Sequence, residues 1–322
     1  MFKPIRQLAA GLTLSLAASW CLAQQVMIPP VIKIVMPFAA GSTTDLIARM
    51  LASHLATRLG TTVVVDIRGG GSTMIGAGAV ANGPKDGSML LITTNSTVTA
   101  AATLKTVPFD INRDLLPIAV IGDGPMLVGV SSKTGIKTPA DLVAAARKKP
   151  DALTHGTSGI GSLPHLSVEL FNAAAKVQIS HVPYKGGGAA VVDLAAGTID
   201  VMFATNSTLA PHVQSGRVNL VAVTTPQPSP LFPGLPTLTS VAPGYSGSVW
   251  VAVFASSSIP PALAQRLNRE INDIAASKEV KEVLVSNGFP PVALSLGELH
   301  TRMRTEYDSW KQIAQSKKIA LD

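Results

Sequence analysis

Apolar positions along the chain alternate between runs and helical spacing, which predicts a series of strands and helices. The run VIKIVM at 31–36 predicts a buried strand. Apolar residues then recur every four positions, namely Ile47, Leu51, Leu55 and Leu59. This spacing is typical of an amphipathic helix, which Gly60 would end. TTVVVDI at 61–67 predicts a second buried, parallel strand, and SMLLITT at 88–94 a third. Alternating strands and helices favour a parallel sheet with right-handed crossovers.

The same order of elements returns in the second half of the chain. A strand with its loop, a helix, a glycine-ended strand, a helix and a further strand are predicted at 153–165, 166–176, 177–188, 189–197 and 198–208. Three glycines follow the second strand of each half, at 69–71 and 186–188. The tetrapeptide TNST follows the third strand of each half, at 94–97 and 205–208. These matching positions predict two similar α/β lobes.

Two further strands are predicted where one lobe gives way to the other, at 125–134 and 248–258, each followed by proline and a helix. If both cross between the lobes, the C-terminal segment completes the first lobe. We therefore expect lobe 1 to comprise 24–128 and 251–322, and lobe 2 to comprise 129–250. Ligands of parallel α/β sheets bind beyond the carboxyl ends of the strands. Two such sheets joined by two hinges predict a ligand cleft that closes.

The first 23 residues predict a cleaved secretory signal peptide. Lys3 and Arg6 precede an apolar stretch that is too short for a permanent membrane span, and the expected cleavage follows Ala23. A lipid anchor on Cys21 is disfavoured because Trp20 stands where such a signal needs a small residue. A retained membrane anchor is the other alternative. The leader predicts a periplasmic protein.

Cysteine content and charge exclude several classes of function. Cys21 is the only cysteine, so a mature chain would contain no thiolate nucleophile, cysteine-bound zinc or internal disulfide. The formal charge of +7 falls to +5 without the leader, and the basic residues are scattered rather than gathered in a stripe. This distribution argues against nucleic-acid binding. A mild positive field would still steer an anionic ligand towards the protein.

Two loops of small residues precede predicted helices, PFAAGSTTD at 37–45 and GTSGIGSLPH at 156–165. Free N–H groups and the dipole at a helix start favour anions, and small residues let a ligand approach the backbone. The alternative is a simple turn with Ser42 or Thr43 as N-cap. We expect Asp45 to order its loop, although water-mediated ligand contact and helix capping stay open. The candidate ligand-binding residues are Phe38, Ala39, Gly41, Ser42, Thr43, Asp45, Asn95, Thr157, Ser158, Gly161, Ser162, His165 and Asn206.

Catalytic motifs are incomplete in this sequence, so no enzyme activity is predicted. GTSGIG lacks the final glycine of a nucleophile elbow, because Ile160 stands there. The six histidines show no metal-ligand spacing, and neither a metal nor a cofactor is expected. A serine–histidine pair of Ser158 or Ser162 with His155 or His165 remains the hydrolase alternative. A sensing or signalling partner without a transport role is another.

The mature chain resembles a known family, the periplasmic substrate-binding proteins of tripartite tricarboxylate transporters, often called Bug proteins. The resemblance is carried by PFAAGSTTD, VVVDIRGGGSTMIGAGAVA, VPFDINRDLLPIAVI, GTSGIGSLPH, VPYKGGGAAVVDLAAGTIDVMF, PGLPTLTSVAPGY and SVWVAVFASSSIPPALAQRLNREIN. It implies a type II periplasmic-binding-protein fold, a di-, tri- or aromatic carboxylic acid held between two lobes, no cofactor, a monomer, and delivery to a membrane transporter. Ala39 and Ser42 depart from the family's usual proline and glycine, and Ser42 adds a hydroxyl.

Overall fold

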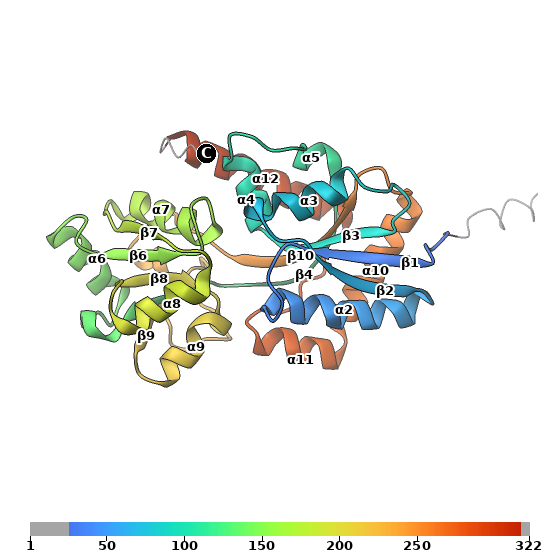
Figure 1. The fold of residues 1–322 in the computed structure, drawn as a ribbon. Coiled ribbons are helices and arrows are strands. Elements are labelled where there is room, and N and C mark those ends of the chain that lie inside the picture. The colour runs from blue at the N-terminus through green and yellow to red at the C-terminus, as the bar shows by residue number, and fades with distance from the viewer. Residues whose placement is uncertain (1–25, 317–322) are drawn as a thin grey trace, which may run out of the picture.

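The computed structural model describes residues 26–316 and contains two five-stranded sheets, which lie side by side in Figure 1. The strands of the first sheet are β1 (Val31–Met36), β2 (Thr62–Ile67), β3 (Met89–Thr94), β4 (Leu115–Gly124) and β10 (Val249–Ser256). Those of the second are β5 (Leu127–Ser131), β6 (Thr154–Thr157), β7 (Ser180–Pro183), β8 (Val201–Ala204) and β9 (Val218–Val223). The strand orders are β2-β1-β3-β10-β4 and β7-β6-β8-β5-β9. The two orders correspond strand for strand, so the predicted α/β fold with two similar lobes is confirmed.

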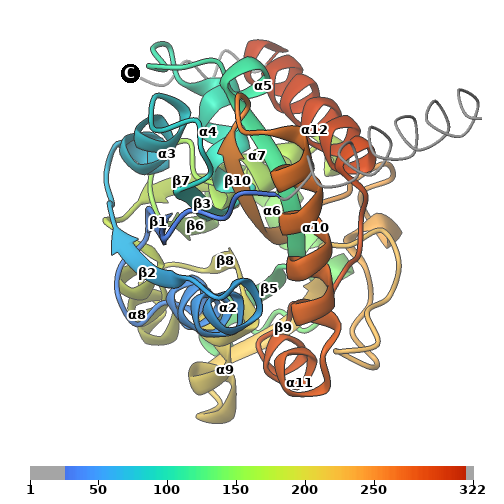
Figure 2. The same cartoon turned by 90° about the vertical axis from the view of Figure 1, so that its right-hand side faces the viewer.

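Helices cover both faces of each sheet (Figures 1 and 2). The helices on the first sheet are α2 (Thr43–Leu59), α3 (Met74–Ala81), α4 (Ser96–Thr103), α5 (Ile111–Asp114), α10 (Pro261–Ala276), α11 (Lys278–Ser286) and α12 (Leu296–Ser316). Those on the second are α6 (Pro139–Lys148), α7 (Leu163–Ala175), α8 (Gly187–Ala196) and α9 (Asn206–Gln214). Short 3₁₀ turns occur at η2 (Gly71–Thr73), η3 (Ser132–Thr134) and η4 (Leu238–Ser240).

The alternation of side chains along β10 shows how the layers are built. Val251 and Val253 pack in the apolar cluster of α2, α10 and α11, whereas Trp250 and Phe254 pack in that of α3, α4 and α12. Successive residues of a strand point to opposite faces, and an apolar run is therefore the expected pattern for a strand covered on both sides. All eight residues of β10 are buried. β10 is therefore an interior strand of the first sheet, between β3 and β4.

The prediction of purely parallel sheets is wrong in part. β1 pairs in parallel with β2 and β3, and β6 with β7 and β8. β10, however, runs antiparallel to β3 and β4, and β5 runs antiparallel to β8 and β9. Both exceptions are the strands that the chain reaches directly from the other sheet. β5 and β10 begin at the cleft and run away from it, whereas β1, β3, β6 and β8 run towards the cleft. The two groups of strands are therefore antiparallel.

The prediction that residues 61–67 form a buried strand is also wrong. β2 is parallel, as expected, but it lies at the edge of the first sheet. None of its residues is buried, and Val64 and Ile67 are exposed. An edge strand has a neighbour on one side only. A valine-rich run therefore does not distinguish a central strand from an edge strand.

The chain passes between the sheets twice, and both passages adjoin a strand predicted from sequence. Residues 125–126 separate β4 from β5, and residues 224–248 separate β9 from β10. Sheet pairing places all of β5 in the second sheet and all of β10 in the first. The lobe boundaries after residues 128 and 250 remain a prediction. The signal peptide predicted for residues 1–23 lies outside the described residues.

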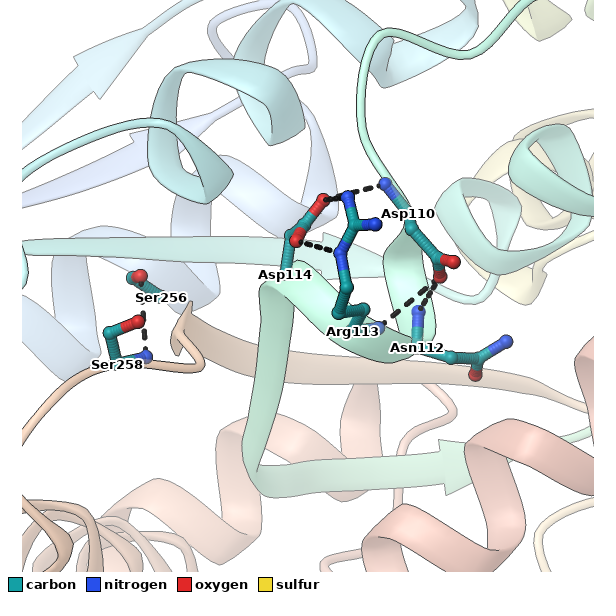
Figure 3. Close-up of polar contacts among 6 residues, drawn as sticks. All are labelled: Asp110, Asn112, Arg113, Asp114, Ser256 and Ser258. Carbon is teal, nitrogen blue, oxygen red and sulfur yellow. Dashed lines mark hydrogen bonds and ion pairs between the residues drawn. The ribbon is translucent and has the colours of Figure 1, made fainter.

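Figure 3 shows the polar contacts of the short helix α5, which directly precedes β4. Asp110 caps it by accepting from the Asn112 and Arg113 N–H groups, at 2.9 and 3.2 Å. The Arg113 guanidinium pairs with Asp114 at 2.7 Å, and the Asp114 carbonyl accepts from the Ser257 N–H just after β10. These contacts join the start of β4 to the end of β10, away from the cleft.

Within residues 26–316, no helix combines the length and apolar character needed to cross a bilayer.

Candidate functional site: a cavity between the lobes

A cavity of about 460 Å³ lies where loops of the two lobes meet. Its lining residues are Pro37, Phe38, Ala39, Gly70, Ser72, Thr73, Ser96, Ala100, Ser158, Gly159, Ile160, Gly161, Ser162, Lys185 and Gly186. The first-lobe residues follow β1, β2 and β3, and the second-lobe residues follow β6 and β7. The cavity therefore lies beyond the carboxyl ends of parallel strands in both sheets, which is where α/β folds bind ligands. Its volume is in the range of small-molecule sites.

The electrostatic character of the cavity favours an anion. Four helix N-termini lie at its wall, those of α3, α4, α7 and α8, and the loop that precedes α2 also contributes lining residues. Each brings the positive end of a helix dipole. Among the described residues that line the cavity, Lys185 is the one cation and none is acidic. Apolar contacts come from side chains such as Phe38 and Ile160. This combination suits an organic anion with a carbon skeleton.

The first loop is held by its own aspartate. The Gly41 N–H donates to Asp45 Oδ2 at 2.9 Å, and Arg49 Nε pairs with Asp45 Oδ1 at 2.9 Å. These two donors hold the pKa of Asp45 below its ordinary value. Ser42 is the N-cap of α2, and its hydroxyl accepts from the Asp45 N–H at 3.2 Å. In this geometry the Asp45 carboxylate orders the loop and does not line the cavity.

The second loop is held by hydroxyls and a histidine. Thr157 Oγ1 donates to the Gly159 carbonyl at 3.1 Å, and Ser162 Oγ donates to the same carbonyl at 2.7 Å. The Gly161 N–H donates to His165 Nδ1 at 3.1 Å. The hydroxyl of Ser162 and the ring of His165 are thus directed at different groups. Throughout the described segment, neither Ser158 nor Ser162 forms the serine–histidine hydrogen bond of the hydrolase alternative.

Three histidines stack behind the second loop. The ring centroids of His165 and His181 are 3.9 Å apart, and those of His155 and His181 are 4.9 Å apart. Burial, together with the charge of neighbouring imidazoles, lowers the pKa of His155 to about 3 and that of His165 to about 4. His181 Nε2 lies 2.6 Å from Thr157 Oγ1. The stack is therefore neutral near pH 7. Within residues 26–316 it does not form a group that could hold a metal ion.

The candidate residues named from sequence separate into two sets. Those that line the cavity are Phe38, Ala39, Ser158, Gly161 and Ser162. Those that lie outside its lining are Gly41, Ser42, Thr43, Asp45, Asn95, Thr157, His165 and Asn206. Thr43 Oγ1 donates to Ser207 Oγ at 2.9 Å, which joins α2 to α9 across the cleft. Asn206, the first residue of α9, lies beside this contact.

Asn95 belongs to a polar network at the hinge. Its Nδ2 donates to Glu306 Oε1 at 2.7 Å and to the Ser248 carbonyl at 2.9 Å. Glu306 also accepts from Trp250 Nε1 at 2.7 Å, and its burial raises the pKa of the carboxyl group. On the same helix, Arg302 pairs with Asp123 at 2.6 Å. Asn95 therefore connects the start of α4 to the hinge, while its neighbour in sequence, Ser96, lines the cavity.

Sequence reasoning missed several wall residues, among them those in the segments 70–73 and 185–186. The only signal for them was the pair of GGG runs at matching places in the two halves. In the first segment, Ser72 and Thr73 have φ values of 51° and 78°. Positive φ is unusual for a β-branched residue and is a recognised feature of functional sites. The Thr73 hydroxyl is held by Thr97 Oγ1 at 2.8 Å.

Comparison with curated sequences finds relatives over nearly the whole chain. A UPF0065 protein in the tcbD-tcbE intergenic region of Pseudomonas sp. (strain P51) is 31% identical over 312 residues, which are 96% of this chain and 93% of the relative. Protein BugT of Bordetella pertussis is 31% identical over 287 residues, which are 88% of each chain. Identity at this level across both lobes shows common descent of the whole chain.

Solved structures agree with this relationship. Rpa4515 of R. palustris with adipate has a TM-score of 0.82 and 32% identity, covering 90% of this chain and 98% of the other. The periplasmic binding protein BugD has a TM-score of 0.79 and 26% identity, covering 91% and 99%. BugD is thus a binding protein and not an enzyme. Residues 47–319 match the family model described as the tripartite tricarboxylate transporter family receptor, TctC, and the chain belongs to this family of periplasmic solute-binding proteins.

Proposed function

We propose that this protein is exported to the periplasm, captures a small organic carboxylate between its lobes and delivers it to the membrane components of a tripartite tricarboxylate transporter. The ligand class comprises di-, tri- and aromatic carboxylic acids, and the protein acts as a monomer. Family membership supports the transporter partner. The adipate in the similar Rpa4515 structure supports a carboxylate ligand. Serine–histidine hydrolysis has no support in the described geometry.

The observation that carries this proposal is the cavity lined by four helix starts and Lys185, with no acidic residue among its described lining. A helix terminus contributes roughly 0.3–2 kcal/mol to an adjoining charge. A hydrogen bond to a charged group contributes about 1.5–3 kcal/mol. Micromolar affinity needs about 8 kcal/mol, and association itself has a large entropic cost. Donors from both lobes are therefore required, which explains why the ligand is held between them.

A panel of acids tests the function. Adipate, malate, citrate and benzoate are compared by thermal shift and titration calorimetry, with adipamide as the uncharged match to adipate. At least one acid is expected to stabilise the protein, by about 2.7 kcal/mol at a hundredfold excess over its Kd. Adipamide is expected to give no shift, and the acid is expected to be recovered unchanged after long incubation. Chemical turnover, or equal stabilisation by the amide, would contradict the proposal.

Replacing Lys185 with glutamine is expected to weaken binding of the stabilising acid by about threefold to tenfold, because the cavity loses its one described lining cation. Lys185 is exposed, so salt screens its charge. The difference between variant and wild type is therefore expected to shrink between about 20 mM and about 300 mM NaCl. Titration calorimetry at both salt concentrations measures it.

Lys148→Gln, on the exposed end of α6, is the matched control and changes the net charge equally. It is expected to leave the Kd unchanged. An equal loss in both variants would show that only the overall charge of the protein matters.

A further inference from the structure

The two ligand-facing loops share a motif at corresponding places in the two lobes. Each has glycine and serine followed, after two residues, by a side chain that accepts a hydrogen bond: Gly41, Ser42 and Asp45 in the first, and Gly161, Ser162 and His165 in the second. The glycines have φ values of 78° and 74°. In each lobe the glycine N–H donates to the side chain four residues later, and the serine is the N-cap of the following helix. The loops therefore have the same local design.

The two acceptors differ in charge. Asp45 is a carboxylate, and Arg49 Nε compensates it at 2.9 Å. His165 needs no such partner because its Nδ1 accepts the Gly161 N–H as a neutral imidazole with its proton on Nε2. His165 is 8% exposed and stacked on His181. Both arrangements hold a loop N–H without adding net negative charge beside the cavity.

The position of His165 indicates what it controls. Its own ring does not line the cavity, but the residue that it holds, Gly161, does, together with Ser158 and Ser162. The left-handed backbone at Gly161 can rotate, so an acceptor at a fixed place determines which way the neighbouring peptide groups face. The stacked ring of His181, itself bonded to Thr157, limits rotation of the His165 side chain.

We infer that His165 is a positioning residue of the ligand site: its uncharged ring fixes the Gly161 N–H, and thereby the cavity-facing segment 158–162, without placing a negative charge beside a carboxylate ligand. This inference rests on the proposed function. It assigns the second lobe's selectivity for anions to a residue that does not contact the ligand. In the first lobe the Asp45–Arg49 pair has the same role, because it holds the Gly41 N–H without adding net negative charge.

Three variants separate geometry from charge, with adipate as the probe. His165→Asn keeps a neutral acceptor, and its Kd is expected within about threefold of wild type. His165→Leu removes the acceptor and is expected to weaken binding by about tenfold or more. His165→Asp keeps an acceptor but adds charge near the ligand, and it is also expected to weaken binding by about tenfold or more. Asp45→Asn, the first-lobe match, keeps a neutral acceptor and is expected to bind adipate at least as tightly as wild type.

Hydrogen exchange of the Gly161 amide, followed by ¹⁵N NMR without ligand, gives a readout independent of binding. His165→Leu is expected to accelerate this exchange by at least about tenfold, and His165→Asn to restore protection. Melting temperatures show whether each variant is folded. Unchanged exchange in folded His165→Leu would overturn the positioning role, and wild-type affinity in His165→Asp would overturn the charge argument. If the wild type binds no acid of the panel, the proposed function fails, whereas the exchange experiment still decides whether His165 holds Gly161.

Discussion

Gly124→Ala is expected to destabilise the protein by about 3 kcal/mol or more, since the added methyl group would overlap the backbone carbonyl of Gly288. Gly124 ends β4, immediately before the first passage between the lobes. The neighbouring Asp123 N–H donates to the Pro290 carbonyl at 3.1 Å, which holds the two segments together. The clash is with backbone atoms, so no side-chain rotation relieves it. For a chain of this size the melting temperature is expected to fall by about 6 °C or more.

Gly297→Ala is the matched control for this variant. Gly297 lies in the first turn of α12, and an added methyl group there meets no atom within 4 Å. Alanine favours helix over glycine, so this variant is expected to match wild type or gain up to about 1 kcal/mol. Thermal and urea unfolding of both variants measure the difference. Equal stability would mean that β4 and the segment at Gly288 separate without cost, contrary to their close packing.

The order and type of the elements could be read from the sequence because the signals are local. The spacing of Ile47 and Leu51 and the glycine at 60 predict α2 and its end, and Gly60 does adopt a left-handed conformation with φ 65°. Strand direction was not readable in the same way. The run VWVAVFAS of β10 is apolar whichever way it enters the sheet. Its antiparallel direction follows from the lobe that the chain has just left, which is long-range information.

The candidate site was predictable only where its signal was local. The loops at 37–45 and 156–165 are recognisable in the sequence as runs of small residues between a strand and a helix. Both contribute to the cavity wall. Asn95 also stands at a helix start, yet its amide bonds to Glu306, which is 211 positions away. No local pattern predicts that partner. Lys185 was missed because the glycine run after it indicates backbone freedom and says nothing about which cavity the lysine faces.

Acid is expected to destabilise the protein through its buried histidines, and His155→Phe is expected to remove much of this effect. His155 is 0% exposed, and neither of its ring nitrogens has a hydrogen-bond partner among the described residues. Burial lowers its pKa to about 3 from 6.5. The unfolded chain therefore takes up a proton near pH 6.5, whereas the folded chain does so only near pH 3. Stability is complete above about pH 6.5 and is lost as the pH falls towards 3.

One pKa unit corresponds to about 1.4 kcal/mol, so the loss assigned to His155 is on the order of 4 kcal/mol at pH 3. His155→Phe keeps an aromatic ring for stacking on His181 and has no proton to bind. Near pH 7 it is expected to be as stable as wild type or more stable, since it buries no unpaired nitrogen. At pH 4 it is expected to be clearly more stable. Urea unfolding between pH 4 and pH 8 measures, for the wild type and for His155→Phe, the slope of the free energy of unfolding against pH.

His300→Gln is the control, because His300 is an exposed residue of α12 and its removal leaves the buried stack intact. Carboxylates that protonate in acid contribute equally to all three proteins, so the difference between variants isolates the histidine. His155→Phe is expected to show a shallower slope than both the wild type and His300→Gln. If all three slopes coincide, the imidazole of His155 binds its proton equally in the folded and unfolded chain. The conclusion that the histidine stack behind the second loop is uncharged would then be wrong.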